Sequence, residues 1–224
     1  MKRLICLTLA LILMAVSFVA CEKEEPHTAP TADSIDFSTL SDFSKVTLTE
    51  EQTDYVVIDV ESFGSIVLRL YPDVAPETVA NFKKLVSEKF YDGLTFHRII
   101  KGFMIQGGCP KGDGTGDAGA TIKGEFSANG FENNLPHNRG VLSMARGNEN
   151  DSASCQFFIV HTTEQSTHLN GQYAAFGYTV FGMDVVDEIA SVSVFKSSNR
   201  PHNTVKINTV RFASIPADAF VAAQ

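Results

Sequence analysis

The sequence has little positive charge. It holds 18 lysine and arginine residues against 26 aspartate and glutamate residues, a formal net charge of −8, and the basic residues nowhere form a run. Proteins that bind nucleic acid gather lysine and arginine on one face, and this chain has no segment that would do so. We therefore expect no nucleic-acid partner.

Cysteine is scarce, and its spacing matches no metal or redox motif. The four cysteines are Cys6, Cys21, Cys109 and Cys155, and no two of them are separated by two residues. A disulfide between Cys109 and Cys155 stays open, because the sequence does not give the distance between them.

Motifs for metal and phosphate are also missing. The six histidines show no His-Glu-x-x-His spacing, and Asp113 and Asp117 lack the remaining ligands of a calcium loop. Residues 112–116 (GDGTG) are rich in glycine, but no Lys-Ser/Thr pair follows them as in a phosphate-binding loop. We expect no metal and no cofactor.

One long hydrophobic run is present, at the N-terminus. Lys2 and Arg3 precede an apolar stretch over residues 4–20, and Cys21 follows it directly. This pattern is typical of a secretory signal over residues 1–20. It resembles a bacterial lipoprotein signal in which Cys21 becomes the lipidated first residue, with Phe18 where leucine is usual. The alternative is an uncleaved membrane anchor, since about 17 apolar residues just suffice to span a bilayer.

The residues behind Cys21 indicate a location and a tether. Residues 22–25 (EKEE) look like the acidic sorting signal that sends some Gram-negative lipoproteins to the outer face of the outer membrane. Residues 21–53, rich in Ser, Thr, Asp and Pro, predict a flexible tether with a short ordered piece at 46–48. Signal removal leaves 16 of the 18 basic residues and a net charge of −10. We expect an envelope protein anchored by lipid in the outer membrane, facing either the periplasm or the cell surface.

The rest of the chain predicts one domain at residues 54–213, followed by a short tail at 214–224. Short apolar or β-branched runs at residues 55–60 and 65–70 flank a hairpin signal, and a last strand is expected at 205–212. Apolar residues recur at helical spacing after Pro76 and again over residues 185–189. Many short strands with two helices predict a mainly β (α+β) fold, a closed barrel capped by two helices.

The most informative stretch is residues 96–108 (FHRIIKGFMIQGG), together with residues 156–159 (QFFI). Alternate residues of an extended segment share a face, so Phe96, Arg98 and Ile100 are expected to point one way. Met104 and Gln106 are expected to share a face after the turn. A guanidinium held by amide side chains beside an apolar slot suits a ligand that is apolar yet carries a backbone carbonyl, as an X-Pro peptide does. Taken singly, the same runs also fit ordinary core strands.

Several runs follow one another in a familiar order over residues 55–212: APETVANF, FHRIIKGFMIQGG, GDGTG, GVLSMAR, SCQFFIV and LNGQYAAFG. On these runs the chain resembles the cyclophilins, which are peptidyl-prolyl cis-trans isomerases. The resemblance implies eight antiparallel strands in the barrel and an enzyme that rotates X-Pro bonds without a cofactor.

The resemblance also implies roles for individual residues. The catalytic pair is Arg98 and the Gln106 that braces it. The positions expected to bind substrate are Phe103, Met104, Ala145, Arg146, Gln156, Phe158, His168, Leu169 and Tyr173. Thr115 and Cys155 are expected to gate the subsite that precedes proline.

Three positions depart from the common pattern of the family. His168 stands where many eukaryotic members carry a tryptophan associated with tight cyclosporin binding, so we expect weak cyclosporin binding. Tyr173 replaces a histidine of the pocket and keeps an aromatic wall with a polar tip. Arg146 replaces an asparagine whose role runs through the backbone, so the change alters mainly the charge of the rim.

We expect a monomer that acts on proline-containing segments of exported proteins and assists their folding. One alternative is a non-catalytic chaperone that holds proline-containing peptides in the same groove, although such a protein would not need Arg98. A second alternative is a surface interaction module in which the barrel is only a scaffold, and the acidic run at residues 22–25 is its main support.

Overall fold

The computed structural model of the protein describes residues 28–222, so the predicted signal peptide and Cys21 lie outside the described residues. The two α-helices of this part are α1 (Pro76–Ser87) and α2 (Met183–Ala190). Its strands are β1 (Thr39–Leu40), β2 (Thr47–Thr49), β3 (Tyr55–Val60), β4 (Gly64–Leu70), β5 (Phe96–Ile100), β6 (Met104–Gly107), β7 (Val141–Met144), β8 (Phe157–Val160), β9 (Ala175–Phe181), β10 (Ile207–Ser214) and β11 (Phe220–Val221). Between residues 28 and 222, no helix combines the length and apolarity needed to cross a bilayer.

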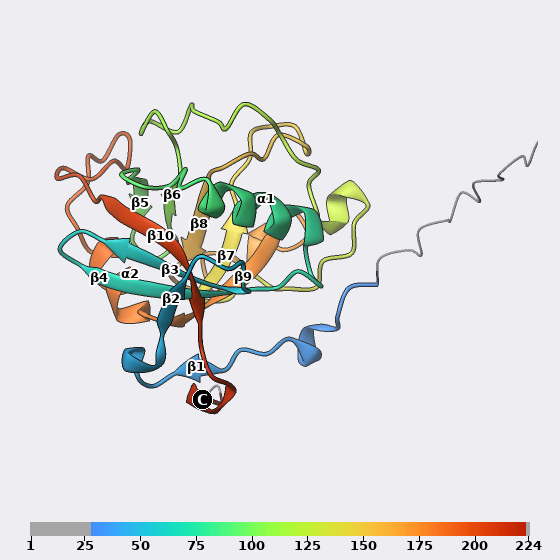
Figure 1. The fold of residues 1–224 in the computed structure, drawn as a ribbon. Helices are drawn as coiled ribbons and strands as arrows, with labels where there is room; N and C mark the ends of the chain where they lie inside the picture. Colours follow the sequence, from blue (N-terminus) through green and yellow to red (C-terminus); the bar gives the residue numbers. More distant parts are fainter. Residues whose placement is uncertain (1–27, 223–224) are drawn as a thin grey trace, which may run out of the picture.

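The main sheet has nine antiparallel strands in the order β2-β10-β3-β4-β9-β7-β8-β6-β5 (Figure 1). The hairpin predicted between residues 60 and 65 joins β3 to β4. Ser62 and Gly64 lie there in the left-handed region, with φ of 67° and 114°, which lets the chain reverse within a few residues. The mainly β fold with two helices is therefore confirmed.

The expected closed barrel of eight strands is wrong for residues 28–222, which hold eleven strands and an open strand order. Between the two ends of the sheet, the chain before β5 and the chain before β10 approach at a single bridge, Thr95 to Lys206. Three backbone hydrogen bonds join these segments, from the amides of Phe96, Gly93 and Ile207 to the carbonyls of Val205, Ile207 and Leu94 at 2.8–2.9 Å, but β5 and β10 themselves do not pair. The free edge of β10 is instead paired further on with β2, a strand from the segment that precedes the domain.

Strand β5 contains an irregularity that changes which residues share a face. Phe96 pairs with Gly107 and Arg98 with Gln106, so two steps along β5 match one step along β6. Such a bulge breaks the alternation of side chains. Phe96 is consequently buried in the main core while Arg98 lies on the other face, and the expectation that both point the same way is wrong.

Both predicted helices are confirmed, and they bury their apolar faces against the sheet. In α1 the buried side chains Val79, Phe82 and Leu85 join the largest core cluster. The Glu125 carboxylate accepts hydrogen bonds from the backbone amides of Glu77 and Thr78, at 3.0 and 2.7 Å, and so satisfies free donors at the start of α1.

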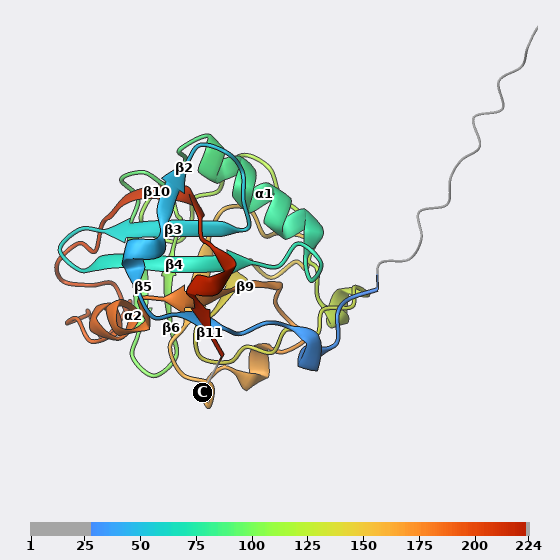
Figure 2. The same cartoon turned by 60° about the horizontal axis from the view of Figure 1, so that its bottom comes forward.

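The segment before the domain is more ordered than a flexible tether. Residues 28–53 run along the sheet (Figure 2), where β1 pairs with β11 and β2 extends the edge of β10. Ile35 and Leu40 are buried, and the Asp36 carboxylate forms an ion pair with Arg69. The expected tether of residues 21–53 therefore needs correction over residues 28–53. Its scattered apolar side chains find a hydrophobic surface there, and the tail at 214–224 contributes β11 to the same small sheet.

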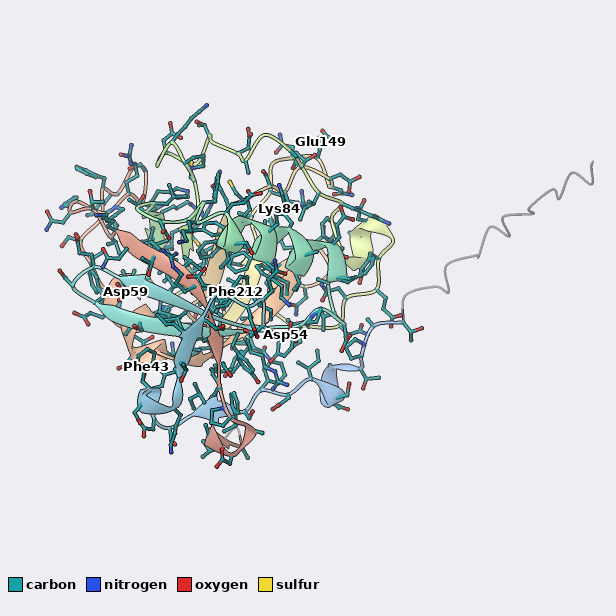
Figure 3. All side chains as sticks on the ribbon, in the orientation of Figure 1. Phe43, Asp54, Asp59, Lys84, Glu149 and Phe212 are labelled. Atoms are coloured by element: carbon teal, nitrogen blue, oxygen red, sulfur yellow. The ribbon has the colours of Figure 1, made fainter. Side chains whose placement is uncertain are left out.

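The order of this segment still leaves some apolar side chains at the surface. Phe43, labelled in Figure 3, is 36% exposed, and Leu48 is 57% exposed. Figure 3 also shows Glu149 on a loop at the opposite side of the molecule from Phe43. That loop belongs to the region in which the predicted site residues meet.

Candidate active site

The residues predicted to form the proline pocket line one cavity of about 280 Å³ beside β5, β6 and β8. Met104, Phe158 and Leu169 form its buried wall, with exposed fractions of 1%, 5% and 5%. The lining residues are Arg98, Phe103, Met104, Gln106, Ala145, Arg146, Phe158, His168, Leu169 and Tyr173. The structure thus brings together ten of the residues predicted from sequence, although they come from distant parts of the chain.

Arg98 is half-buried at the rim of this pocket, and its guanidinium is held from one side. Its Nη1 donates to Gln106 Oε1 over 3.1 Å and lies 3.7 Å from Met104 Sδ. Burial lowers the pKa of Arg98, and the nearby Tyr173 partly offsets this effect. An arginine remains charged at neutral pH all the same. Arg98 therefore presents a fixed cationic donor to whatever occupies the pocket.

Phe103 sits in the turn between β5 and β6, and this turn is anchored from β8. The Gly102 amide donates to His161 Nδ1 over 2.9 Å, and the His161 amide donates to the Phe103 carbonyl over 2.8 Å. The Phe103 ring stacks on His168, with ring centroids 5.6 Å apart and planes at 29°. His168 itself is exposed, as expected for a residue at the outer lip of a groove.

The Arg146 side chain does more than alter the charge of the rim. Its guanidinium lies over the rings of Tyr173 and Phe126, at 4.8 and 5.1 Å from their centroids. Its Nε also donates to the Gln172 carbonyl over 3.1 Å. Arg146 thereby connects the segment that carries Tyr173 to the end of β7.

A second cavity, of about 250 Å³, adjoins the first and shares Gln106, Ala145 and Arg146 with it. Both predicted gate residues line it: Thr115 is exposed at its edge, and Cys155 is buried. Cys109 and Cys155 are both free thiols in the structure. Gln156 lines this second cavity and not the first, and its Oε1 accepts from Gln106 Nε2 over 3.0 Å.

The sequence interpretation missed two residues behind the pocket. His137 stacks on Phe158, with centroids 6.0 Å apart and planes at 18°, and Phe126 lies beneath Arg146. Neither His137 nor Phe126 stands in a run that carries the resemblance. Their ring and guanidinium partners in the pocket, Phe158 and Arg146, lie at least 20 residues away in the chain, so no local pattern indicates these contacts.

The arrangement suits a reaction that needs no covalent chemistry. The apolar slot has room for a small ring, and Arg98 stands at its rim as a donor held by Gln106. The second cavity leaves room for a chain that continues past the ring. The positions of the residues agree with those expected, while their individual roles stay predictions.

Comparisons with known proteins agree with this geometry. Residues 55–212 match the model of the family described as "Cyclophilin type peptidyl-prolyl cis-trans isomerase/CLD". Peptidyl-prolyl cis-trans isomerase B of Bacillus subtilis is 46% identical over 145 residues, which cover 65% of this chain and 95% of that protein. A peptidyl-prolyl cis-trans isomerase of Synechococcus elongatus is 51% identical over 116 residues, covering 52% and 74%.

A solved structure shows the same fold. The chain is similar to a cyclophilin-type peptidyl-prolyl cis-trans isomerase of Cryptosporidium parvum, crystallised in the presence of the dipeptide Ala-Pro. The TM-score is 0.65 and the identity 29%, over 71% of this chain and 99% of that one. With the family match extending over most of the chain, the protein belongs to the cyclophilin-type peptidyl-prolyl cis-trans isomerases.

Proposed function

We propose that this protein catalyses the cis-trans isomerisation of X-Pro bonds in exported proteins and so assists their folding. The observation that carries the proposal is the guanidinium of Arg98, held by Gln106 at the rim of an apolar pocket. A mere holder of apolar peptides would have no use for a charged donor whose partial burial already costs free energy.

Rotation about an X-Pro bond is slow because amide resonance gives the C–N bond partial double-bond character, with a barrier of about 18–20 kcal/mol. When the bond twists, resonance is lost and the imide nitrogen becomes able to accept a hydrogen bond. Arg98 is the residue placed to donate to it. Because this bond forms only in the twisted state, it lowers the barrier instead of merely tightening binding.

The pocket supplies the second requirement, which is a fixed proline. With the ring held against Met104, Phe158 and Leu169, the carbonyl that precedes proline is the part left free to swing. Arg98 keeps its proton throughout, so no proton transfer is required. The preceding part of the peptide would extend over Ala145 toward the second cavity.

The test is a protease-coupled isomerisation assay on a proline peptide with the full chain purified in detergent. We expect Arg98→Ala to fold normally and to lower kcat/KM by about 10²–10³-fold, the usual loss for one preorganised donor. Arg98→Lys keeps the charge but loses the planar guanidinium, so its kcat/KM should lie between those of the wild type and Arg98→Ala. Arg211→Ala removes an arginine paired with Asp92 outside the two cavities and should retain activity. A folded Arg98→Ala protein with the kcat/KM of the wild type would refute the mechanism. Binding without turnover by the wild type would indicate a non-catalytic holder.

We also propose that the chain is attached to the outer membrane through a lipid on Cys21. The support is the sequence pattern at residues 1–25, which lies outside the described residues. Lipid chains supply membrane affinity of about 0.8 kcal/mol per buried methylene, so the protein should partition into detergent and incorporate labelled fatty acid. Cys21→Ser should abolish both. Protease added to intact cells then separates the two faces: digestion supports surface display, and protection until the outer membrane is opened supports a periplasmic location.

A further inference from the structure

An unbroken chain of hydrogen bonds connects the glycine-rich loop at residues 112–116 to Arg98. Gln156 Nε2 donates to the carbonyls of Gly114 and Gly116, at 2.9 and 2.8 Å. Gln156 Oε1 accepts from Gln106 Nε2 over 3.0 Å, and Gln106 Oε1 accepts from Arg98 Nη1 over 3.1 Å.

The direction of this chain is fixed at both ends, by the carbonyls of the loop and by the guanidinium of Arg98. A carbonyl oxygen only accepts hydrogen bonds, so Gln156 must turn its NH₂ group toward Gly114 and Gly116. The oxygen of Gln156 then faces Gln106, which must donate to it with its own NH₂ group. Gln106 is left with its oxygen toward Arg98, as a guanidinium requires. Were the loop carbonyls displaced, Gln156 would lose the acceptors that hold its NH₂ group, and Gln106 would lose the fixed oxygen that accepts from its own NH₂ group.

The loop itself is held by the sulfur of Cys109. Cys109 Sγ accepts from the amides of Gly114 and Gly116, each at 3.3 Å, and the residue is only 1% exposed. These are the two residues whose carbonyls hold Gln156. Gly112 and Gly114 adopt φ of +66° and +87°, so this part of the loop has no regular strand or helix geometry of its own.

The groups around the Cys109 sulfur are backbone amides that donate hydrogen bonds to it. Backbone amides of the loop lower the pKa of Cys109 in spite of its burial, because N–H donors stabilise the thiolate. The neighbouring Gly116 packs closely against Pro110, since a Cβ at residue 116 would lie 2.9 Å from Pro110 Cγ. Removal of the sulfur would therefore leave two buried or half-buried amides without their acceptor.

We infer that Cys109 is a positioning residue for the isomerase reaction: its sulfur fixes Gly114 and Gly116, and these residues orient Gln156 and Gln106 toward Arg98. The inference rests on the proposed function. Cys109 touches no substrate in this arrangement and acts only through the loop and the two amides.

The experiment measures kcat and KM for Cys109→Ala, Gln106→Ala and the double variant, in the same assay with the full chain. The loss of one oriented hydrogen bond to Arg98 should lower kcat by about 3- to 10-fold in Cys109→Ala. In the Gln106→Ala background the same substitution should change kcat by less than about 2-fold, because the residue through which it acts is gone. Cys109→Ser retains an acceptor and should recover part of kcat.

Two further measurements distinguish a positioning role of Cys109 from a merely structural one. Val79→Ala in α1 creates a cavity in a buried site outside both cavities and the hydrogen-bond chain, so it should lower stability but leave kcat unchanged below its unfolding temperature. The side-chain amide signals of Gln106 and Gln156 in an NMR spectrum should shift in Cys109→Ala but not in Val79→Ala. If Cys109→Ala does not fold, Cys109→Ser is measured alone and in the Gln106→Ala background.

Two results would overturn the inference: wild-type kcat in Cys109→Ala, or losses from Cys109→Ala and Gln106→Ala that multiply in the double variant. Either result leaves the proposed function intact as long as Arg98→Ala is inactive. An inactive wild type would overturn the proposed function, and the positioning role with it, so the two failures are distinguishable.

Discussion

The burial of His137 predicts a steep loss of stability in mild acid. The residue is 1% exposed, with Nε2 2.9 Å from Ser143 Oγ and Nδ1 3.1 Å from Asn170 Oδ1. Desolvation lowers its pKa from 6.5 to about 4, and the bond to Asn170 offsets only part of this effect. Because its ring stacks on Phe158, a charge on His137 would disturb the wall of the cavity that Phe158 lines.

The size of this loss of stability follows from the linkage between proton binding and folding. Between pH 6.5 and about 4 the unfolded chain holds a proton on His137 that the folded chain does not. The free energy of unfolding therefore rises with pH across this window, and the contribution is fully present only above pH 6.5. The difference between the two pKa values corresponds to about 3 kcal/mol, a large part of the stability of a typical domain.

The assay is urea unfolding at several pH values between 4 and 7, followed by circular dichroism because the chain contains no tryptophan. His137→Asn removes the titrating group while keeping a polar side chain, and the same carboxylates titrate in both proteins. The wild type should lose about 2–3 kcal/mol more than His137→Asn over this range. Equal losses in the two proteins, or an NMR titration of His137 with a midpoint near 6.5, would refute the reasoning.

Two other perturbations test the outer lip of the groove and the segment before the domain. His168→Trp should bind cyclosporin more tightly than the wild type, as measured by calorimetry, without a matching change in turnover. The reason is that an indole adds aromatic contact worth about 0.5–1.5 kcal/mol beyond its buried area. Equal affinities of the two proteins would show that His168 does not face the inhibitor. Ile35→Ala should lower the free energy of unfolding by about 2 kcal/mol or more, since Ile35 is 8% exposed in a cluster with Leu169 and Phe158. Leu48→Ala, at a site 57% exposed, serves as the matched control and should change stability by less than about 0.5 kcal/mol; the same loss in both variants would mean that residues 28–53 do not pack as described.

Local patterns in the sequence were enough to place several elements, whereas the residues of the pocket were named from the resemblance to the cyclophilins. Helix α1 could be predicted because Val79, Phe82 and Leu85 recur at the period of a helix, and a one-sided apolar stripe has to be buried. The run at residues 96–108 by itself indicated an arginine held by amide side chains beside an apolar slot, because an arginine between apolar neighbours is unusual. Such signals are carried by residues close together in the chain.

Only the tertiary structure decided the features that depend on contacts between distant residues. The bulge in β5 separates Phe96 from Arg98 because β6 sets the register, and no property of the run itself reveals the extra residue. The segment at residues 28–53 reads as a tether because its apolar side chains are few, yet Ile35 and Leu40 find a surface made by strands far along the chain. The direction of the amides of Gln106 and Gln156 likewise depends on the loop that Cys109 holds. Composition and periodicity describe what a segment prefers by itself, whereas these features arise from partners that only folding brings within a few ångströms.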